Sequence, residues 1–306
     1  MTELFNEPVH NIKKVKIIYF SGTGGTARVS SQLEKSLTSH DIEVQRTALD
    51  MPEIEYRTSS ANIQRDDLLI LIFAVHAFDA PEPVYDWIHA IPEGVGQSAA
   101  VISVSGSGEI WPNTACRAGC IKLLEQKGYD VFYERMIVMP SNIFVATKDQ
   151  LAIRLLQVLP AKAENCVTEI LSGVRRRRRP PISSRIMSAI FKGEKNGAKQ
   201  FPKYLQVGET CTGCGWCANN CPRKNIELVN SRPSFGGQCV ACLRCIYGCP
   251  SKAIHIRKFG FITIKEGYNL DELENRMRGV ALEPIEKVKA GILFIGVRDY
   301  LLNKDV

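Results

Sequence analysis

The sequence lacks two features that would place it in a membrane or among secreted proteins. No apolar run reaches the roughly 18 residues of a membrane-spanning helix. The longest apolar stretches are Leu68 to Ala74 and Ala290 to Val297. The N-terminal residues MTELFNEPVHNIKK lack the apolar segment of a secretory signal peptide. We therefore expect a cytoplasmic protein with no membrane span, and not a disulfide-stabilised extracellular scaffold.

The residue composition is ordinary apart from the cysteines. Hydrophobic residues make up 45% and charged residues 23% of the 306 positions, which indicates globular domains. The formal net charge is +7. No aromatic or groove-reading element accompanies the basic run Arg175–Arg179, so nucleic acid is not an expected partner. Of the eleven cysteines, eight lie between Cys211 and Cys249, and this density predicts metal binding.

Short apolar runs alternate with helix-like stretches between residues 15 and 171. Several of the apolar runs are hydrophobic on both faces, and such strands form parallel sheets that helices cover on both sides. We predict an α/β fold with a doubly wound, five-stranded parallel sheet. The expected strands are 15–20, 42–47, 68–75, 99–105 and 131–139, and the expected helices are 26–37, 84–91, 113–127 and 148–171.

The composition changes after residue 171. Five arginines followed by Pro180 and Pro181 do not continue a compact helix, because like charges repel and proline stops the backbone ladder. We interpret the arginine run as a solvated connector; a docking patch for an acidic redox partner is the alternative. The final residues read as amphipathic helices over Leu270–Met277 and Ile285–Leu302, without evident chemistry. The predicted division is 1–171, a basic linker 172–200, a small α+β domain 201–258, and a C-terminal extension 259–306.

The cysteines form an internal repeat. Each half reads C-x2-C-x2-C-x3-C-P, and three cysteines at this spacing wrap one metal cube while the fourth reaches the opposite one. Zinc is the alternative, but tetrahedral zinc uses paired C-x2-C knuckles. We predict two [4Fe–4S] clusters. One would be held by Cys211, Cys214, Cys217 and Cys249, and the other by Cys239, Cys242, Cys245 and Cys221.

The repeat resembles the bacterial ferredoxins that carry two [4Fe–4S] clusters. The resemblance covers residues 201–258 and implies two clusters of low potential, close enough for rapid electron exchange. It also implies a reducing compartment in a cell that tolerates oxygen-labile cofactors. This segment departs from the usual acidic ferredoxin because it carries eight lysines or arginines and two glutamates.

A glycine- and hydroxyl-rich loop follows the first predicted strand. Because the loop precedes a helix, its backbone N–H groups and the helix dipole converge on one point that suits a phosphate. A P-loop is excluded because no lysine is present. Three interpretations stay open: an FMN phosphate loop of the form S/T-x-T-G-x-T, a dinucleotide fingerprint with Glu43 as the acidic residue, and a plain turn. The loop consists of Ser21, Gly22, Thr23, Gly24, Gly25 and Thr26.

The loop resembles that of flavodoxin, and the resemblance extends over about residues 15–170. It implies an FMN site at the carboxyl ends of the first, third and fourth strands, where open α/β sheets bind ligands. By family analogy, Phe78 or Trp111 would stack on the flavin ring and backbone amides of the fourth loop would contact its polar edge. The walls implied in this way are His76, Ala77, Phe78 and Asp79 after the third strand, and Ser105, Gly106, Ser107, Gly108, Trp111 and Asn113 after the fourth.

Weaker signals lie nearby. His76 approaches the flavin in one interpretation and is a loop histidine without a catalytic role in the other. Residues 139–142 end the fifth strand near the same rim and resemble a segment of related fusion proteins. Cys116, Cys120 and Cys166 lack cluster spacing and are interpreted as core residues.

The order of the parts resembles microbial flavodoxin–ferredoxin fusion proteins over nearly the whole chain. The resemblance implies electron transfer between two clusters and FMN, since each cluster passes one electron and FMN holds one or two. The main hypothesis is a reductase of a small acceptor, fed by a ferredoxin or flavoprotein donor. The alternatives are an electron carrier between protein partners and a redox sensor.

Overall fold

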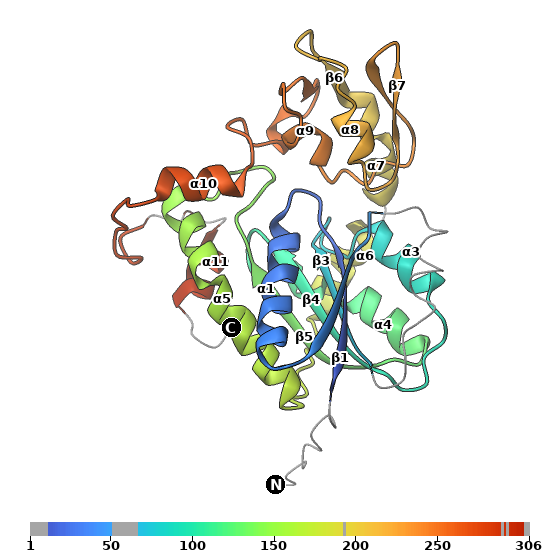
Figure 1. Cartoon of the computed structure of the whole chain (residues 1–306), viewed down its shortest axis with the longest axis vertical. Helices are drawn as coiled ribbons and strands as arrows, with labels where there is room; N and C mark the ends of the chain where they lie inside the picture. The colour runs from blue at the N-terminus through green and yellow to red at the C-terminus, as the bar shows by residue number, and fades with distance from the viewer. Residues whose placement is uncertain (1–11, 51–66, 192–193, 289–290, 292–293, 303–306) are drawn as a thin grey trace.

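In the computed structural model of the chain, the described residues are 12–50, 67–191, 194–288, 291 and 294–302 (Figure 1). Residues 1–11 of the predicted first domain, 192–193 of the predicted linker, and 289–290, 292–293 and 303–306 of the predicted extension lie outside them, as do residues 51–66.

Five parallel strands form one sheet in the order β2-β1-β3-β4-β5. This order is that of the flavodoxin-like doubly wound fold, in which the order of strands along the sheet reverses at a switch point between β1 and β3. The predicted fold class is therefore confirmed. The strands are β1 (Lys14–Phe20), β2 (Glu43–Ala48), β3 (Asp67–Ala74), β4 (Ser98–Ser105) and β5 (Asp130–Val138).

Helices cover both faces of the sheet. On β3, Ile70 and Ile72 face one core, and Leu71 and Phe73 face the other, because successive side chains of a strand point to opposite faces. All four are fully buried. The first core includes side chains of α1 (Gly25–Ser39) and α5 (Asp149–Leu171), and the second those of α3 (Glu82–Ala90) and α4 (Ala118–Gln126).

The cysteine-rich segment is a small α+β unit over the carboxyl end of the sheet (Figure 1). Two antiparallel strand pairs frame it, and a short helix contains the third cysteine of each repeat. The paired strands are β6 (Leu205–Val207) with β9 (Ile254–Ile256), and β7 (Ile226–Val229) with β8 (Arg232–Phe235). The helices are α8 (Trp216–Asn219) and α9 (Arg244–Tyr247).

Three predicted stretches differ from the structure. The expected helix 113–127 is a 3-10 turn, η1 (Asn113–Ala115), followed by α4. The expected linker 172–200 contains α6 (Ile182–Phe191) and α7 (Glu194–Gln200), leading into η2 (Phe201–Tyr204). Of the expected helix 285–302, the described residues form a helix only over α11 (Ile295–Leu302), and residues 285–288 are not helical. The remaining elements are η3 (Gly260–Ile262) and α10 (Leu270–Met277), and α10 has its predicted bounds.

The arginine run lies along the outer edge of β5, and all of its arginines except the half-buried Arg176 are exposed to solvent. The N–H of Arg176 donates to the carbonyl of Phe132 at 3.0 Å, and its own carbonyl accepts from Glu134 N at 2.8 Å. The Arg175 guanidinium pairs with Asp130 at 2.7 Å. Arg177 and Arg178 also meet acidic side chains, of Glu125 and Glu109. The run therefore protects a sheet edge by pairing with it.

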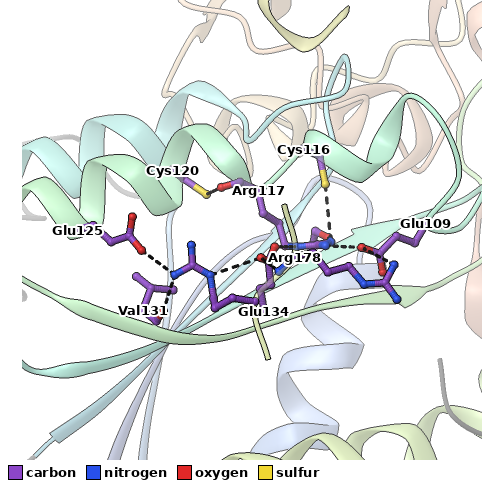
Figure 2. A network of polar contacts seen from close by, with 10 residues as sticks. Glu109, Cys116, Arg117, Cys120, Glu125, Val131, Glu134 and Arg178 are labelled. Carbon is purple, nitrogen blue, oxygen red and sulfur yellow. Dashed lines mark hydrogen bonds and ion pairs between the residues drawn. The ribbon is translucent and has the colours of Figure 1, made fainter. Parts of the chain in front are cut away.

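A buried ionic network lies beneath this edge (Figure 2). The Arg117 side chain is 1% exposed and donates to Glu134 at 2.7 Å, to Ser103 at 2.7 Å and to Glu109. Burial acts to lower the pKa of Arg117, but Cys116, Glu109 and Glu134 outweigh it, so the pKa is raised and the guanidinium stays charged. A buried charge of this kind requires its partners.

Among the described helices, none is both long enough and apolar enough to span a bilayer.

Candidate functional site

The loop between β1 and α1 has the shape of an anion cradle. Gly24 adopts φ +96°, a backbone conformation that glycine accepts without strain. The Ser21 hydroxyl accepts from the N–H groups of Gly24 and Ala27, both at 3.2 Å, and so holds the turn closed. The Thr26 side chain is buried at the base of the loop.

Several amides of this loop remain available. Within the described part of the chain, the N–H groups of Thr23, Gly25 and Thr26 have no hydrogen-bond acceptor. They lie at the N-terminus of α1, where the helix dipole favours negative charge. The loop thus fits a phosphate group by the chemistry of its donors.

The loop after β3 is a tight turn. His76 and Asp79 exchange two backbone hydrogen bonds, both at 3.0 Å, across Ala77 at φ +47° and Phe78 at φ +61°. Non-glycine residues in the left-handed region carry backbone strain, which is more frequent at functional sites. The Phe78 ring packs edge-on against Phe191 of α6, with ring centroids 5.0 Å apart. Phe78 is therefore engaged with α6 in this structure.

The loop after β4 is organised by one amide. The Asn113 side chain is 5% exposed and donates to Ser107 Oγ at 2.9 Å, Ser105 Oγ at 3.0 Å and the Gly108 carbonyl at 3.2 Å. The side chain of Asn113 therefore shapes the loop from behind. Trp111 precedes it with its side chain 58% exposed.

Two further segments pack against the loop after β4. A Cβ added at Gly106 would lie 2.7 Å from Ser141 Cα, in the loop after β5. A Cβ added at Gly296 of α11 would lie 2.3 Å from the Ser107 carbonyl oxygen. The C-terminal extension thus packs directly on the fourth loop, a role that its sequence alone did not indicate.

The loop after β5 joins the glycine loop to the cysteine-rich unit. Asn142 Nδ2 donates to Thr23 Oγ1 at 2.7 Å, and the Asn142 carbonyl accepts from the Tyr247 hydroxyl at 2.8 Å. Tyr247 Oη also accepts from Ile264 N at 2.8 Å. Of these residues, Asn142 belongs to the segment that the sequence singled out, and Tyr247 lies within α9.

The second cysteine set lines one cavity. The cavity, of about 30 Å³, is bounded by four thiol-bearing residues and by apolar side chains that include Phe201, Ile226 and Leu243. One of the four cysteines comes from the first repeat and three from the second, as the spacing predicts for a crossed ligand set. The four are Cys221, Cys239, Cys242 and Cys245.

The first cysteine set includes a solvent-exposed member, unlike the second set. The Cys217 thiol is close enough to Cys211 and Cys249 that both raise its pKa, after the larger effect of burial. Cys214 is exposed. The Trp216 ring lies against Gly248, where an added Cβ would be 1.8 Å from the ring, so the indole shields the segment before Cys249.

In both repeats, the sulfur of the fourth cysteine accepts a hydrogen bond from a backbone N–H. Cys221 Sγ accepts from Asn225 N at 3.4 Å, and Cys249 Sγ accepts from Ala253 N at 3.3 Å. Burial acts to raise the pKa of Cys249, but hydrogen bonds to its sulfur outweigh it and the pKa is lowered. Burial raises the pKa of Cys239 to about 12. A buried thiol with a raised pKa needs a positive partner to be a thiolate, and metal binding supplies one.

Among the described residues, no group of three or more His, Cys, Asp or Glu side chains is arranged to hold a single metal ion. A mononuclear zinc site requires thiolates about 2.3 Å from one ion.

Sequence reasoning did not identify Arg244 as a site residue. Its guanidinium donates to the carbonyls of Ser21 and Gly22 in the glycine loop, at 2.5 and 3.0 Å. The corresponding position of the first repeat is Trp216, so the repeats differ here. That difference between the repeats is the sequence signal that could have identified Arg244 as a site residue.

No protein-family model and no curated protein matches the chain. Among solved structures, a flavodoxin from Pseudomonas aeruginosa is 15% identical with a TM-score of 0.38, covering 53% of this chain and 99% of that one. A flavodoxin from the domain Archaea is 14% identical with a TM-score of 0.32, covering 51% and 98%. An NADH:FMN oxidoreductase is 12% identical with a TM-score of 0.39, covering 52% and 88%. Similarities this weak do not define the chemistry of the chain.

Proposed function

We propose that the chain is an electron-transfer protein that binds FMN at the glycine loop and two [4Fe–4S] clusters at the cysteine repeat. The supporting observation is that four cysteines from both repeats line one cavity, and that this cysteine set contacts the glycine loop through Gly22 and Cys242. FMN would supply one- and two-electron chemistry, and each cluster would supply one-electron chemistry.

The residues have separate roles in this proposal. The free amides of Thr23, Gly25 and Thr26 would bind the FMN phosphate, and Ser21 holds those amides in place. The loops after β3 and β4 would border the ring. The clusters would be held by Cys211, Cys214, Cys217 and Cys249, and by Cys221, Cys239, Cys242 and Cys245.

We favour a reductase of a small acceptor at the flavin, with a low-potential ferredoxin or flavoprotein as donor. An electron carrier between proteins is the second candidate. Exposed aromatic side chains favour the carrier, since such patches mark protein contacts. Phe144 and Phe261 are 57% and 64% exposed and stack with centroids 6.2 Å apart, beside Phe259.

Cofactor analysis tests the common part of both candidates. Protein purified without oxygen should contain about eight irons and eight sulfides per chain, together with one extractable FMN. Zinc in place of iron, or the absence of flavin after addition of FMN, would contradict the proposal. Turnover with reduced ferredoxin and a panel of small acceptors would then separate a reductase from a carrier.

Thr26→Val combined with Thr23→Val tests the phosphate loop. Loss of the hydroxyl donors should weaken FMN binding by about 1–3 kcal/mol, measured by fluorescence titration. The control is Thr212→Val in the exposed part of the cysteine unit, which should bind FMN as the unaltered chain does. Equal affinity of the double variant and the control would argue against this loop.

A further inference from the structure

The glycine loop and the second cysteine set meet at the backbone. A Cβ atom added at Gly22 would lie 2.5 Å from the Cys242 carbonyl oxygen and 3.1 Å from its Cβ. Only glycine permits so close an approach. Val240 is 6% exposed and belongs to the core formed with α3 and α4, and Cys242 packs against the same core. The second repeat is therefore seated on the α/β part of the chain.

Arg244 ties this contact together. Its guanidinium donates to the carbonyls of Ser21 at 2.5 Å, Gly22 at 3.0 Å and Asn220 at 2.9 Å, and it lies 3.6 Å from the Asp50 carboxylate. A planar group with five fixed donors can bridge several carbonyls at once. The side chain of Arg244 is 20% exposed, so water screens these contacts only in part.

The first cysteine set has different neighbours. A Cβ added at Gly213 would lie 2.7 Å from the Ser231 carbonyl oxygen, and one added at Gly215 would lie 3.5 Å from Leu228 Cδ1. Both contacts are with the β7–β8 hairpin, whose residue Leu228 is 42% exposed. The loop that carries the exposed Cys214 thus packs on an outer hairpin and not on the glycine loop.

From these contacts we infer that the second cysteine set is the inner relay to the flavin and the first set the outer one, and that Arg244 is the positioning residue that holds the inner set on the phosphate loop. The inference rests on the proposed function. The external partner, a one-electron donor or acceptor protein, would then approach the first set near the β7–β8 hairpin.

The electron count is consistent with this order. Cys211, Cys214, Cys217 and Cys249 would hold the outer group and Cys221, Cys239, Cys242 and Cys245 the inner one, and each group would supply one-electron chemistry. Two electrons taken one at a time from an external one-electron donor, with protons from solvent, would balance the two-electron reduction of FMN.

Flavin fluorescence distinguishes the inner set from the outer one, because a nearby cluster quenches the excited flavin more strongly than a distant one. Cys239→Ser removes an inner ligand and Cys214→Ser an outer ligand, so each variant should retain about four irons. In anaerobic full-length protein loaded with FMN, Cys239→Ser should raise the fluorescence per bound flavin several-fold. Cys214→Ser should raise it much less. A larger rise in Cys214→Ser, or equal rises in both, would overturn the assigned order.

Arg244→Gln tests the positioning role of Arg244 without changing a cysteine. This second variant keeps the inference testable if a cysteine variant loses both clusters. We expect it to keep its iron, to bind FMN more weakly and to gain flavin fluorescence, with Arg244→Lys intermediate. The matched control is Arg232→Gln, because Arg232 donates to the carbonyls of Val207 and Gly208 within the cysteine unit. Equal fluorescence in Arg244→Gln and Arg232→Gln would refute the role of Arg244. Missing iron or flavin in the unaltered chain would instead refute the proposed function.

Discussion

At the scale of single residues, the stability of the sheet edge depends on one buried cation. Arg117 is nearly inaccessible and its charge is balanced by Glu134 and Glu109, which are themselves 5% and 8% exposed. Removing one member of a buried group leaves an uncompensated charge, which costs much more than the pair contributes to stability. The network in Figure 2 therefore makes several positions interdependent.

Replacing Arg117 by methionine should lower the free energy of unfolding by about 3–5 kcal/mol, because both carboxylates lose their buried partner. Urea unfolding followed by circular dichroism measures this change. The control is Arg175→Gln, which breaks the exposed pair with Asp130 and should cost less than about 1 kcal/mol. Similar losses in the two variants would show that burial does not set the strength of the network.

Buried thiols should make stability depend on alkaline pH. Burial raises the pKa of Cys116 and of Cys166 from 9.0 to about 11, so both stay neutral in the folded chain where they would ionise in the unfolded one. A raised pKa in the folded state stabilises it fully below the unfolded value, and this stability is lost as the pH rises through the folded value.

The melting temperature should therefore fall between pH 9 and pH 11, with at most about 3 kcal/mol lost per thiol. Cys166→Ala should show a shallower fall, since one titrating group is gone. An identical pH dependence in the variant and the unaltered chain would rule out Cys166 as a contributor.

At the scale of elements, local pattern predicted the α/β sheet well. The apolar runs around residues 68–75 and 99–105 are buried on both faces. Their sequences predict this burial because both faces of each strand carry apolar residues. The glycine loop and the cysteine repeat were also recognisable, because both are contiguous motifs with fixed spacing. The bounds of β1 to β5 consequently lie within one residue of their predicted positions at every end.

The elements that sequence did not predict depend on distant partners. The arginine run looks like a linker because its acids, Asp130 and Glu134 among them, lie on β5, far away in the sequence. The α-helix expected from residue 113 begins only at Ala118, after a 3-10 turn whose first residue, Asn113, uses its side chain to hold the fourth loop. Likewise, nothing near Arg244 in the sequence indicates the carbonyls that it binds.

The seating of α11 on the fourth loop depends on a glycine. Gly296→Ala would place a methyl group 2.3 Å from the Ser107 carbonyl oxygen, and relieving this overlap should cost about 1–3 kcal/mol. Hydrogen exchange in residues 295–302 should therefore become faster. Gly197→Ala is the control, because that helical position has open space around an added Cβ. Unchanged exchange in the Gly296 variant would mean that α11 does not need this close approach.

At the scale of the whole molecule, the two parts of the chain have very different cores. The sheet and its helices bury two extensive apolar clusters. The cysteine unit buries few large apolar residues, chiefly Phe201, Ile226, Leu243 and Ile254, besides those that face the sheet. A unit of this size is marginal without a metal or a cross-link. In the proposed function the clusters would therefore also hold the unit folded.

Removing iron should accordingly unfold one part of the molecule and leave the other intact. After anaerobic treatment with a chelator, we expect hydrogen-exchange protection to be lost in β6 to β9 and retained in β1, β3 and β4, whose core does not involve the clusters. The ion pair between Arg223 and Asp86 spans the two parts at 2.7 Å, yet a partly exposed pair contributes too little to keep the cysteine unit folded. Loss of protection in all strands would show that the parts fold as one unit, and protection throughout would show that the cysteine unit is stable without metal. If the cysteine unit unfolds, the glycine loop also loses its contact with Cys242. Iron removal should therefore weaken FMN binding, although the glycine loop itself contains no iron ligand.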